Sequence, residues 1–261
     1  MESLKLFWIF VKTSIQNDTE YRADFFTQLF VVALRAASQL GILWVVFSHT
    51  TSLGGWSRPQ VLALLGVYNF MLGMVFIIIA PNMRQVLEDI RQGTLDFALL
   101  KPVDSQFLVS IRQFSVWRIS DILMGLAMTL YATHEMAQTL TLREAVLFPL
   151  MLLSGGAIVY SLWLALTTAA FWFTRIDNIE MIFWNVFEAG RYPIDVYPLQ
   201  VRRLLTYGIP LAFITSVPAR ALGGTLSPPM VVASLVLATA ATLASAWFWR
   251  LGLRRYGSAS S

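Results

Sequence analysis

Long apolar stretches recur along this chain, and they constrain its fold more than any other feature. A helix needs about 20 predominantly apolar residues to cross the hydrocarbon core of a membrane. Hydrophobic residues make up 57% of the sequence and charged residues only 13%, a composition too apolar for a soluble domain to bury. The sequence therefore predicts an all-α integral membrane protein. The stretches long enough to span are Phe26–Phe47, Gln60–Ala80, Ser110–Ala132, Ala145–Phe173 and Met230–Trp249.

The apolar sequence between Ile179 and Leu222 is different, because prolines interrupt it at positions 193, 198, 210 and 218. Proline ends or kinks a helix, so a pair of straight spans is not expected there. We interpret Asn178–Ala189 as a further span, completed into Tyr192. Leu199–Tyr207 and Pro210–Leu222 are expected to form short helices that either re-enter the membrane or lie on its surface. Irregular backbone at membrane depth is tolerated only under protein or water, so re-entrant helices would indicate a pathway or gate.

Six spans place both chain ends on one side, and the basic residues indicate which side that is. Lys and Arg collect in cytoplasmic segments. The side of the termini holds Lys5, Lys12, Arg22, Arg84, Arg91, Lys101, Arg112, Arg175, Arg250, Arg254 and Arg255, whereas the other side holds Arg58, Arg143, Arg191, Arg202, Arg203 and Arg220. We therefore predict one transmembrane domain over residues 1–261 with both termini in the cytoplasm.

The first 25 residues carry an amphipathic pattern rather than a cleavable signal peptide. They contain many charges and no short apolar core that ends in a cleavage site. The pattern indicates a helix lying in the inner membrane interface, or a cytoplasmic helix packed on partner protein. The apolar stripe consists of Leu4, Phe7, Trp8, Val11 and Ile15, flanked by Lys5 and Lys12.

The chain lacks the motifs of enzymes that bind metals or nucleotides. It has no cysteine and only two histidines, His49 and His134, so no metal site is expected. Leu153–Gly156 reads Leu-Ser-Gly-Gly, the opening of an ATPase signature, but it lies inside an apolar span and no phosphate-binding Gly-Lys-Ser/Thr loop exists. Small residues for close helix packing explain it better. We expect no cofactor in this chain and no nucleic-acid partner, because no basic run interleaved with aromatics exists.

The charged residues that lie deep in the predicted spans are Arg35, Arg118, Asp121 and Glu188. Charges inside a membrane are costly and usually pair or serve function. Arg118 and Asp121 stand three apart on one helical face and can pair with each other. Arg35 can snorkel, join an ion pair or contact an anionic headgroup on a substrate. Glu188 can anchor the outer turn or line a gate.

A short charged segment, residues 81–106, connects the second and third predicted spans, and we call it the coupling segment. Leu95, Leu99 and Leu100 can form one apolar face. Gly93 permits a tight bend, Thr94 can cap a helix and Pro102 can stop it. A compact capped helix on the inner side suits docking on a soluble partner.

Two segments resemble ABC-2-type exporter permeases, in particular a subgroup of small ones. Residues 88–103 are similar to the family's Glu-x-Gly-Thr-Leu-Glu-x-Leu-Leu-x-x-Pro element, with departures at Gln92 and Asp96. The outer segment, residues 190–228, is similar to the family's Tyr-Pro and Asn-Pro-Leu outer loop, with Gly208 in place of the Asn. The tail Arg255–Ser260 also resembles the subgroup.

This resemblance implies a function and a set of site residues. It implies a dimeric permease, made with an identical or paralogous chain, in a bacterial inner membrane and in contact with lipid. Two copies of a cytoplasmic ABC ATPase would bind ATP and Mg²⁺, and an amphipathic or lipid-linked substrate would move outward. The implied ATPase-coupling residues are Glu88, Arg91, Gly93, Thr94, Leu95, Asp96, Leu99, Lys101 and Pro102. The implied outer gate consists of Tyr192, Pro193, Tyr197, Pro198 and Pro210.

Other classes of membrane protein fit the sequence less well. A secondary transporter driven by ion gradients would be expected to show internal repeats or acidic groups at the midplane, and we see no repeat and few such acids. An intramembrane enzyme needs titratable groups that converge in one pocket, and the sequence indicates no such set. A structural membrane protein without transport activity stays an open alternative.

Overall fold

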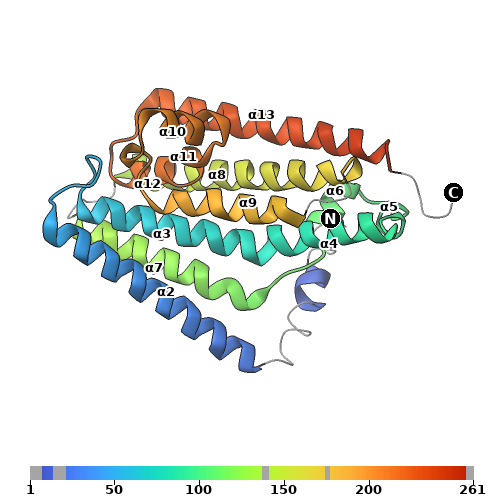
Figure 1. Cartoon of the computed structure of the whole chain (residues 1–261), viewed down its shortest axis with the longest axis horizontal. Helices are drawn as coiled ribbons and strands as arrows, with labels where there is room; N and C mark the ends of the chain where they lie inside the picture. Colours follow the sequence, from blue (N-terminus) through green and yellow to red (C-terminus); the bar gives the residue numbers. More distant parts are fainter. Residues whose placement is uncertain (1–7, 14–21, 137–140, 174–176, 257–261) are drawn as a thin grey trace.

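The computed structural model describes residues 8–13, 22–136, 141–173 and 177–256, and it is a bundle of long helices (Figure 1). Residues 8–13 are helical. The helices that follow are α2 (Arg22–His49), α3 (Arg58–Met74), α4 (Ala80–Gln92), α5 (Asp96–Leu99), α6 (Ser105–Ser110), α7 (Ile119–Glu135), α8 (Leu142–Thr168), α9 (Asp177–Glu188), α10 (Leu199–Arg203), α11 (Leu211–Ile214), α12 (Ser216–Leu222) and α13 (Pro228–Leu253). Within these residues the expected all-α class is confirmed.

Four helical stretches among the described residues are long and apolar enough to cross a membrane: Phe26–His49, Arg58–Gln92, Leu142–Phe171 and Pro228–Leu253. They correspond to four of the predicted spans. The second of them has 35 residues, because α3 continues through a π-helical turn, η1 (Val75–Ile79), directly into α4. The predicted span Gln60–Ala80 is therefore joined to the coupling segment without a break.

The third predicted span, Ser110–Ala132, is wrong at its start. The chain leaves helical geometry after α6, and α7 begins only at Ile119, after a short 3-10 turn, η2 (Val116–Arg118). The Ser115 amide donates instead to the carbonyl of Ile77 in the π-helical turn, at 2.9 Å. Because α7 has 17 residues and α9 has 12, neither is long enough to count as a span by itself, and the total of six crossings stays a prediction.

The core centres on α3, which packs on α7, α8 and α12. Glycines let α3 and α7 approach closely. A Cβ added at Gly125 would lie 2.4 Å from the Phe70 amide nitrogen, and one at Gly66 would lie 2.7 Å from the Thr129 nitrogen. Atoms do not approach that closely without displacement, so both positions require glycine. This contact fixes α7, and with it Asp121, against the middle of the bundle.

Helix α13 packs along α8 through a stripe of small residues, Ser234, Ala238, Ala241 and Ser245. Ser154 bonds both the hydroxyl and the carbonyl of Ser234, at 2.7 and 3.0 Å. The stripe therefore serves packing within the chain. The Leu153–Gly156 run lies inside α8, where a Cβ at Gly155 would lie 3.2 Å from the Ile214 carbonyl oxygen, in agreement with a packing role.

The two ends of the bundle differ. Figure 1 places α5, α6 and the end of α13 at one end, and α10 to α12 with the α2–α3 connection at the other. In the outer segment, α11 and α12 are buried against α8, whereas Leu199, Leu204 and Tyr207 are exposed. Near the N-terminus, Trp8 and Ile9 are exposed and Phe10 packs against the core. The rest of the predicted interfacial stripe lies outside the described residues, except Val11.

Candidate functional site

The coupling segment is a helix, a left-handed turn and a second short helix. Helix α4 ends at Gly93, whose φ of 69° is accessible to glycine at low cost. The Thr94 amide then donates to the Asp89 carbonyl at 2.9 Å, which closes the turn. The predicted bend at Gly93 is confirmed. The predicted cap at Thr94 is wrong, because α5 starts after Leu95 and Thr94 bonds the Asp89 carboxylate at 3.4 Å instead. Helix α5 also ends at Leu99, before Pro102 is reached.

The apolar residues of this segment point in opposite directions. Leu95 is fully buried and Leu99 packs against the core, whereas Leu100 is 81% exposed. The prediction of one face formed by three leucines is therefore wrong. Phe97, which the sequence reading passed over, is 73% exposed beside Leu100. It is the one aromatic residue between positions 81 and 106, and aromatic side chains are enriched where proteins bind each other. The remaining coupling residues on the surface are Glu88, Arg91, Lys101 and Pro102, and Asp96 is half-buried.

A network that the sequence did not reveal holds this segment rigid. Asp89 and Arg112 form an ion pair with an N–O distance of 2.8 Å and side chains that are 9% and 18% exposed. Asn82 exchanges two hydrogen bonds with the backbone of Gln113, at 2.7 and 2.9 Å. Both links join α4 to the chain that follows α6. Because α4 is continuous with α3, the segment is also joined directly to the central helix of the bundle.

The coupling segment also contacts the C-terminal parts of α8 and α13. The Trp249 indole donates to the Ser105 hydroxyl at 3.2 Å, and the Gln106 side-chain amide donates to the Tyr160 hydroxyl on α8 at 3.2 Å. Beyond α13, Tyr256 packs edge-on against Phe171. The segment is therefore attached to α8 and α13 as well as to the two helices that it connects in sequence.

Three of the four charges predicted inside the membrane form one cluster, the arginine–aspartate triad of Arg35, Asp121 and Arg118. Asp121 is almost fully buried and accepts a hydrogen bond from Arg35 on α2 at 2.7 Å. Arg118 lies 3.7 Å from the other carboxylate oxygen, as the three-residue spacing predicts. Arg35 therefore takes part in an ion pair, one of the alternatives that its position left open.

The triad adjoins the π-helical turn of η1. The Arg118 guanidinium lies over the Phe76 ring, 4.4 Å from its centroid, and Phe76 stacks on Trp184 of α9 at 4.5 Å. A π-helical turn inside a long helix often marks a functional position. Here it lies between the coupling segment and the outer half of α3, where a change in helix geometry would move Phe76 and with it Arg118.

The predicted gate residues surround the end of α9. Glu188 pairs with Arg191 at 2.5 Å, which supports the interpretation that it anchors the outer turn. The Tyr197 hydroxyl donates to the Ala189 carbonyl at 2.9 Å. Tyr192 is exposed and Pro193 is buried. Pro198 and Pro210 directly precede α10 and α11. The structure brings Tyr192, Pro193, Tyr197 and Pro198 together after the end of α9. Their role in gating stays a prediction.

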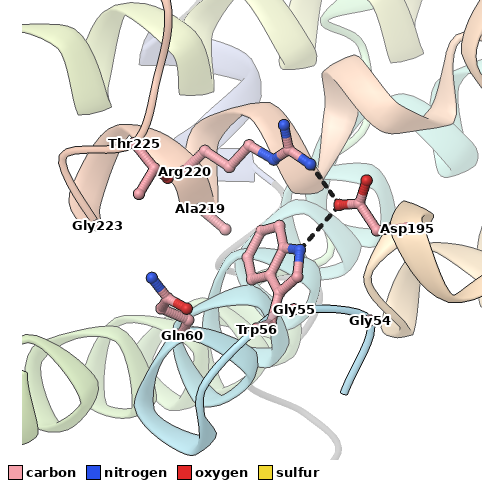
Figure 2. A pocket seen from close by; sticks show the side chains of 9 residues that line it. All are labelled: Gly54, Gly55, Trp56, Gln60, Asp195, Ala219, Arg220, Gly223 and Thr225. Atoms are coloured by element: carbon pink, nitrogen blue, oxygen red, sulfur yellow. Dashed lines mark hydrogen bonds and ion pairs between the residues drawn. The ribbon is translucent and has the colours of Figure 1, made fainter. Parts of the chain in front are cut away.

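Asp195 joins several elements at the end of the bundle that holds α10 to α12, and the sequence analysis did not single it out. Figure 2 shows the Trp56 indole and the Arg220 guanidinium meeting at the Asp195 carboxylate, with an indole hydrogen bond of 2.9 Å. Arg202 binds the other carboxylate oxygen at 2.8 Å. Trp56, Asp195 and Arg220 line a cavity of about 270 Å³. Asp195 is the last acidic residue in the sequence and is followed by several arginines, a signal that could have found it.

The surroundings of Asp195 change its acidity. Burial raises the pKa of this carboxyl, but the hydrogen bonds from Trp56 and Arg220 and the charges of Arg220 and Arg202 together lower it more. The net result is a pKa below the ordinary value. At neutral pH the carboxylate is therefore ionised and joins the α2–α3 connection to the outer segment.

A family model with the description ABC-2 family transporter protein matches residues 33–260. The chain belongs to the ABC-2 transporter family. The matched region begins in α2 and includes the coupling segment, the triad and the outer segment. The ABC-2 assignment makes this a multi-pass membrane transport subunit of a family that generally works with an ABC ATPase. No curated protein matches the chain.

Proposed function

We propose that this chain is the permease subunit of an ATP-driven exporter, and that a separate cytoplasmic ATPase docks on the coupling segment. The observation that carries the proposal is the pair of exposed apolar side chains, Phe97 and Leu100, at the tip of a segment that is otherwise tied to the bundle. Exposed large apolar side chains of this kind mark contact sites for partners. Glu88, Arg91 and Lys101 supply charges on the same segment.

The fixed connections of the coupling segment support a mechanical role. A partner can shift the permease between two states only through contacts that differ between them. Closure of an ATPase dimer would push on α5, which the Gly93 turn joins to α4, and the Asp89–Arg112 pair would carry this force from α4 to the chain that follows α6. The push would then reach the π-helical turn and the triad through α3. The contacts of Trp249 and Tyr160 would move α13 and α8 together with it.

The proposed orientation puts the coupling segment and both termini in the cytoplasm of a bacterial cell. The basic residues near the coupling segment, among them Arg91, Lys101, Arg250 and Arg254, support this orientation. In the proposed topology α7 and α9 are crossings as well. Helix α7 would cross with help from η2 and the segment before it, and α9 with help from the 3-10 turn Ala189–Arg191.

The proposed assembly is two permeases, identical or paralogous, with two ATPases. Helix α2 exposes a row of large apolar residues, including Phe30, Leu34 and Trp44, which need lipid or a second permease to cover them. The substrate would be amphipathic or lipid-linked and would move outward between the two permeases. Substrate class and direction come from the family resemblance alone.

Co-purification of the ATPase tests this proposal. We expect Phe97→Asp combined with Leu100→Asp to insert and fold normally but to lose the nucleotide-hydrolysing subunit when the complex is purified in mild detergent. The matched control is Leu199→Asp, which changes an exposed leucine on α10 at the other end. Equal amounts of ATPase with the wild-type chain and the double variant would disprove the docking assignment.

A further inference from the structure

The arginine–aspartate triad has more positive than negative charge at a depth where water is scarce. Fourteen residues of α7 separate Asp121 from Glu135, a rise of about 21 Å. Glu135 pairs with the half-exposed Arg58 at 2.8 Å and so marks the outer end of α7. In a hydrocarbon core about 30 Å thick, the triad lies in the half of the membrane nearest the coupling segment.

One carboxylate does not satisfy the two guanidinium groups. Each guanidinium has five N–H donors. Arg35 uses one of them for Asp121, and the 3.7 Å separation of Arg118 from Asp121 is too long for a hydrogen bond. Asp121 is thus shared by both arginines, and the triad keeps an excess of positive charge. The two arginine side chains are 23% and 25% exposed, so their remaining donors are accessible. Charges at this depth usually pair, and an anion would balance the excess.

The surface beside the triad is apolar and hollowed. Ile119, Leu123, Leu126 and Leu130 form an exposed stripe along α7 that starts next to Arg118. Farther along the same pair of helices, α2 and α7 enclose a groove of about 520 Å³ with part of α3. It is lined by Leu40, Trp44, Leu62, Met128 and Tyr131, among others. The arginines of the triad suit the anionic headgroup of an amphiphile, and the apolar groove suits its hydrocarbon chain.

We propose that the seam between α2 and α7 binds an anionic amphiphile, with its phosphate on Arg35 and Arg118 and its chain along the groove. Arginine binds phosphate through two parallel hydrogen bonds, and the accessible donors of the triad are suited to this geometry. An apolar helix from a second permease would cover the groove but would leave those donors unsatisfied. The phosphate can come from a resident phospholipid or from a lipid-linked substrate.

This inference depends on the membrane placement in the proposed function but not on ATPase docking, so the two can fail separately. The test is native mass spectrometry of the full-length permease, released from bilayers that contain equal amounts of phosphatidylglycerol and phosphatidylcholine. We expect phosphatidylglycerol to be retained selectively. Arg118→Gln leaves the Arg35–Asp121 pair intact and should lower the retained phosphatidylglycerol about tenfold, the usual order for loss of charged hydrogen bonds.

Two further variants separate binding from simple structural damage. Asp121→Asn removes the carboxylate that competes with the lipid phosphate, so we expect more phosphatidylglycerol to be retained, whereas a purely structural triad would lose it. Arg203→Gln changes an exposed arginine on α10, away from the seam, and should leave binding unchanged. Retention that is unaffected by Arg118→Gln, or is lowered equally by Arg203→Gln, would overturn the proposal.

The source of the phosphate can be read from the same complex once the ATPase is added. Phosphatidylglycerol that stays bound when the complex binds ATP identifies the site as that of a resident lipid. Release on ATP binding, abolished by Arg118→Gln, places the site on the transport route. Both results support the phosphate site.

Discussion

Loss of Arg112 should destabilise the permease through the charge that it leaves behind on Asp89. The two side chains are 18% and 9% exposed and lie 2.8 Å apart, so the pair is largely removed from solvent. Breaking a buried pair by removing one partner costs about 3–5 kcal/mol. Asp89 keeps a hydrogen bond from Gln85 at 2.7 Å, which offsets part of this, so for Arg112→Gln we expect about 2–3 kcal/mol.

A double-mutant cycle isolates this interaction. Arg112→Gln combined with Asp89→Asn leaves two neutral groups of similar shape, so the double variant should regain most of the loss. We expect an interaction energy of about 2 kcal/mol. The free energy of unfolding is measured by titrating the purified protein in dodecyl maltoside with sodium dodecyl sulfate. The control is Arg203→Gln, because Arg203 is exposed at the other end.

Strictly additive effects of the two substitutions would refute this reasoning. They would mean that Asp89 and Arg112 do not depend on each other and that α4 is not held to the chain after α6 by this pair. The proposed transfer of force from α4 to the chain that follows α6 would then have lost its main link.

Three further predictions concern packing and pH. Gly125→Ala should cost about 1–3 kcal/mol or more, since its Cβ would meet the α3 backbone, while Gly156→Ala, which meets nothing within 4 Å, should be neutral by the same detergent titration. Ser234→Ala should cost about 0.6 kcal/mol for its bond with Ser154, and a loss above 2 kcal/mol in that titration would contradict this origin. The pKa of Asp195 is lowered in the fold, so its stabilisation is complete above the unfolded-state pKa of about 3.9 and is lost as the pH falls through the folded-state pKa. The thermal midpoint of wild type should therefore approach that of Asp195→Asn only at strongly acidic pH.

Hydropathy identified the long helices but not the places where they break. The lengths of α2, α8 and α13 follow from apolar stretches that exceed the membrane thickness. The interruption after Ser110 could not be predicted, because it is stabilised by a hydrogen bond from Ser115 to the distant Ile77. The π-helical turn at Val75–Ile79 has a local signal in Pro81, which lacks the N–H that would bond the Ile77 carbonyl four residues earlier, so that this carbonyl is free to accept from Ser115.

At the charged sites too, contacts within one helix could be predicted from the sequence, whereas contacts between helices could not. The pairing of Arg118 with Asp121 follows from their spacing on one helix. The addition of Arg35 does not, because it depends on how α2 lies against α7. In the coupling segment, spacing alone grouped Leu95 with Leu100, and only the packing of α5 on the bundle shows that one is buried and the other exposed.

The most direct test of the central claim uses the absence of cysteine from this chain, which makes any introduced thiol unique. In intact cells, Phe97→Cys should be protected from a membrane-impermeant maleimide, and a cysteine-directed crosslinker should join it to a nucleotide-hydrolysing subunit. Tyr207→Cys, at the opposite end, should be labelled from outside and should form no such crosslink. Labelling of position 97 from outside, or its failure to crosslink to any ATPase in the native complex, would contradict the account.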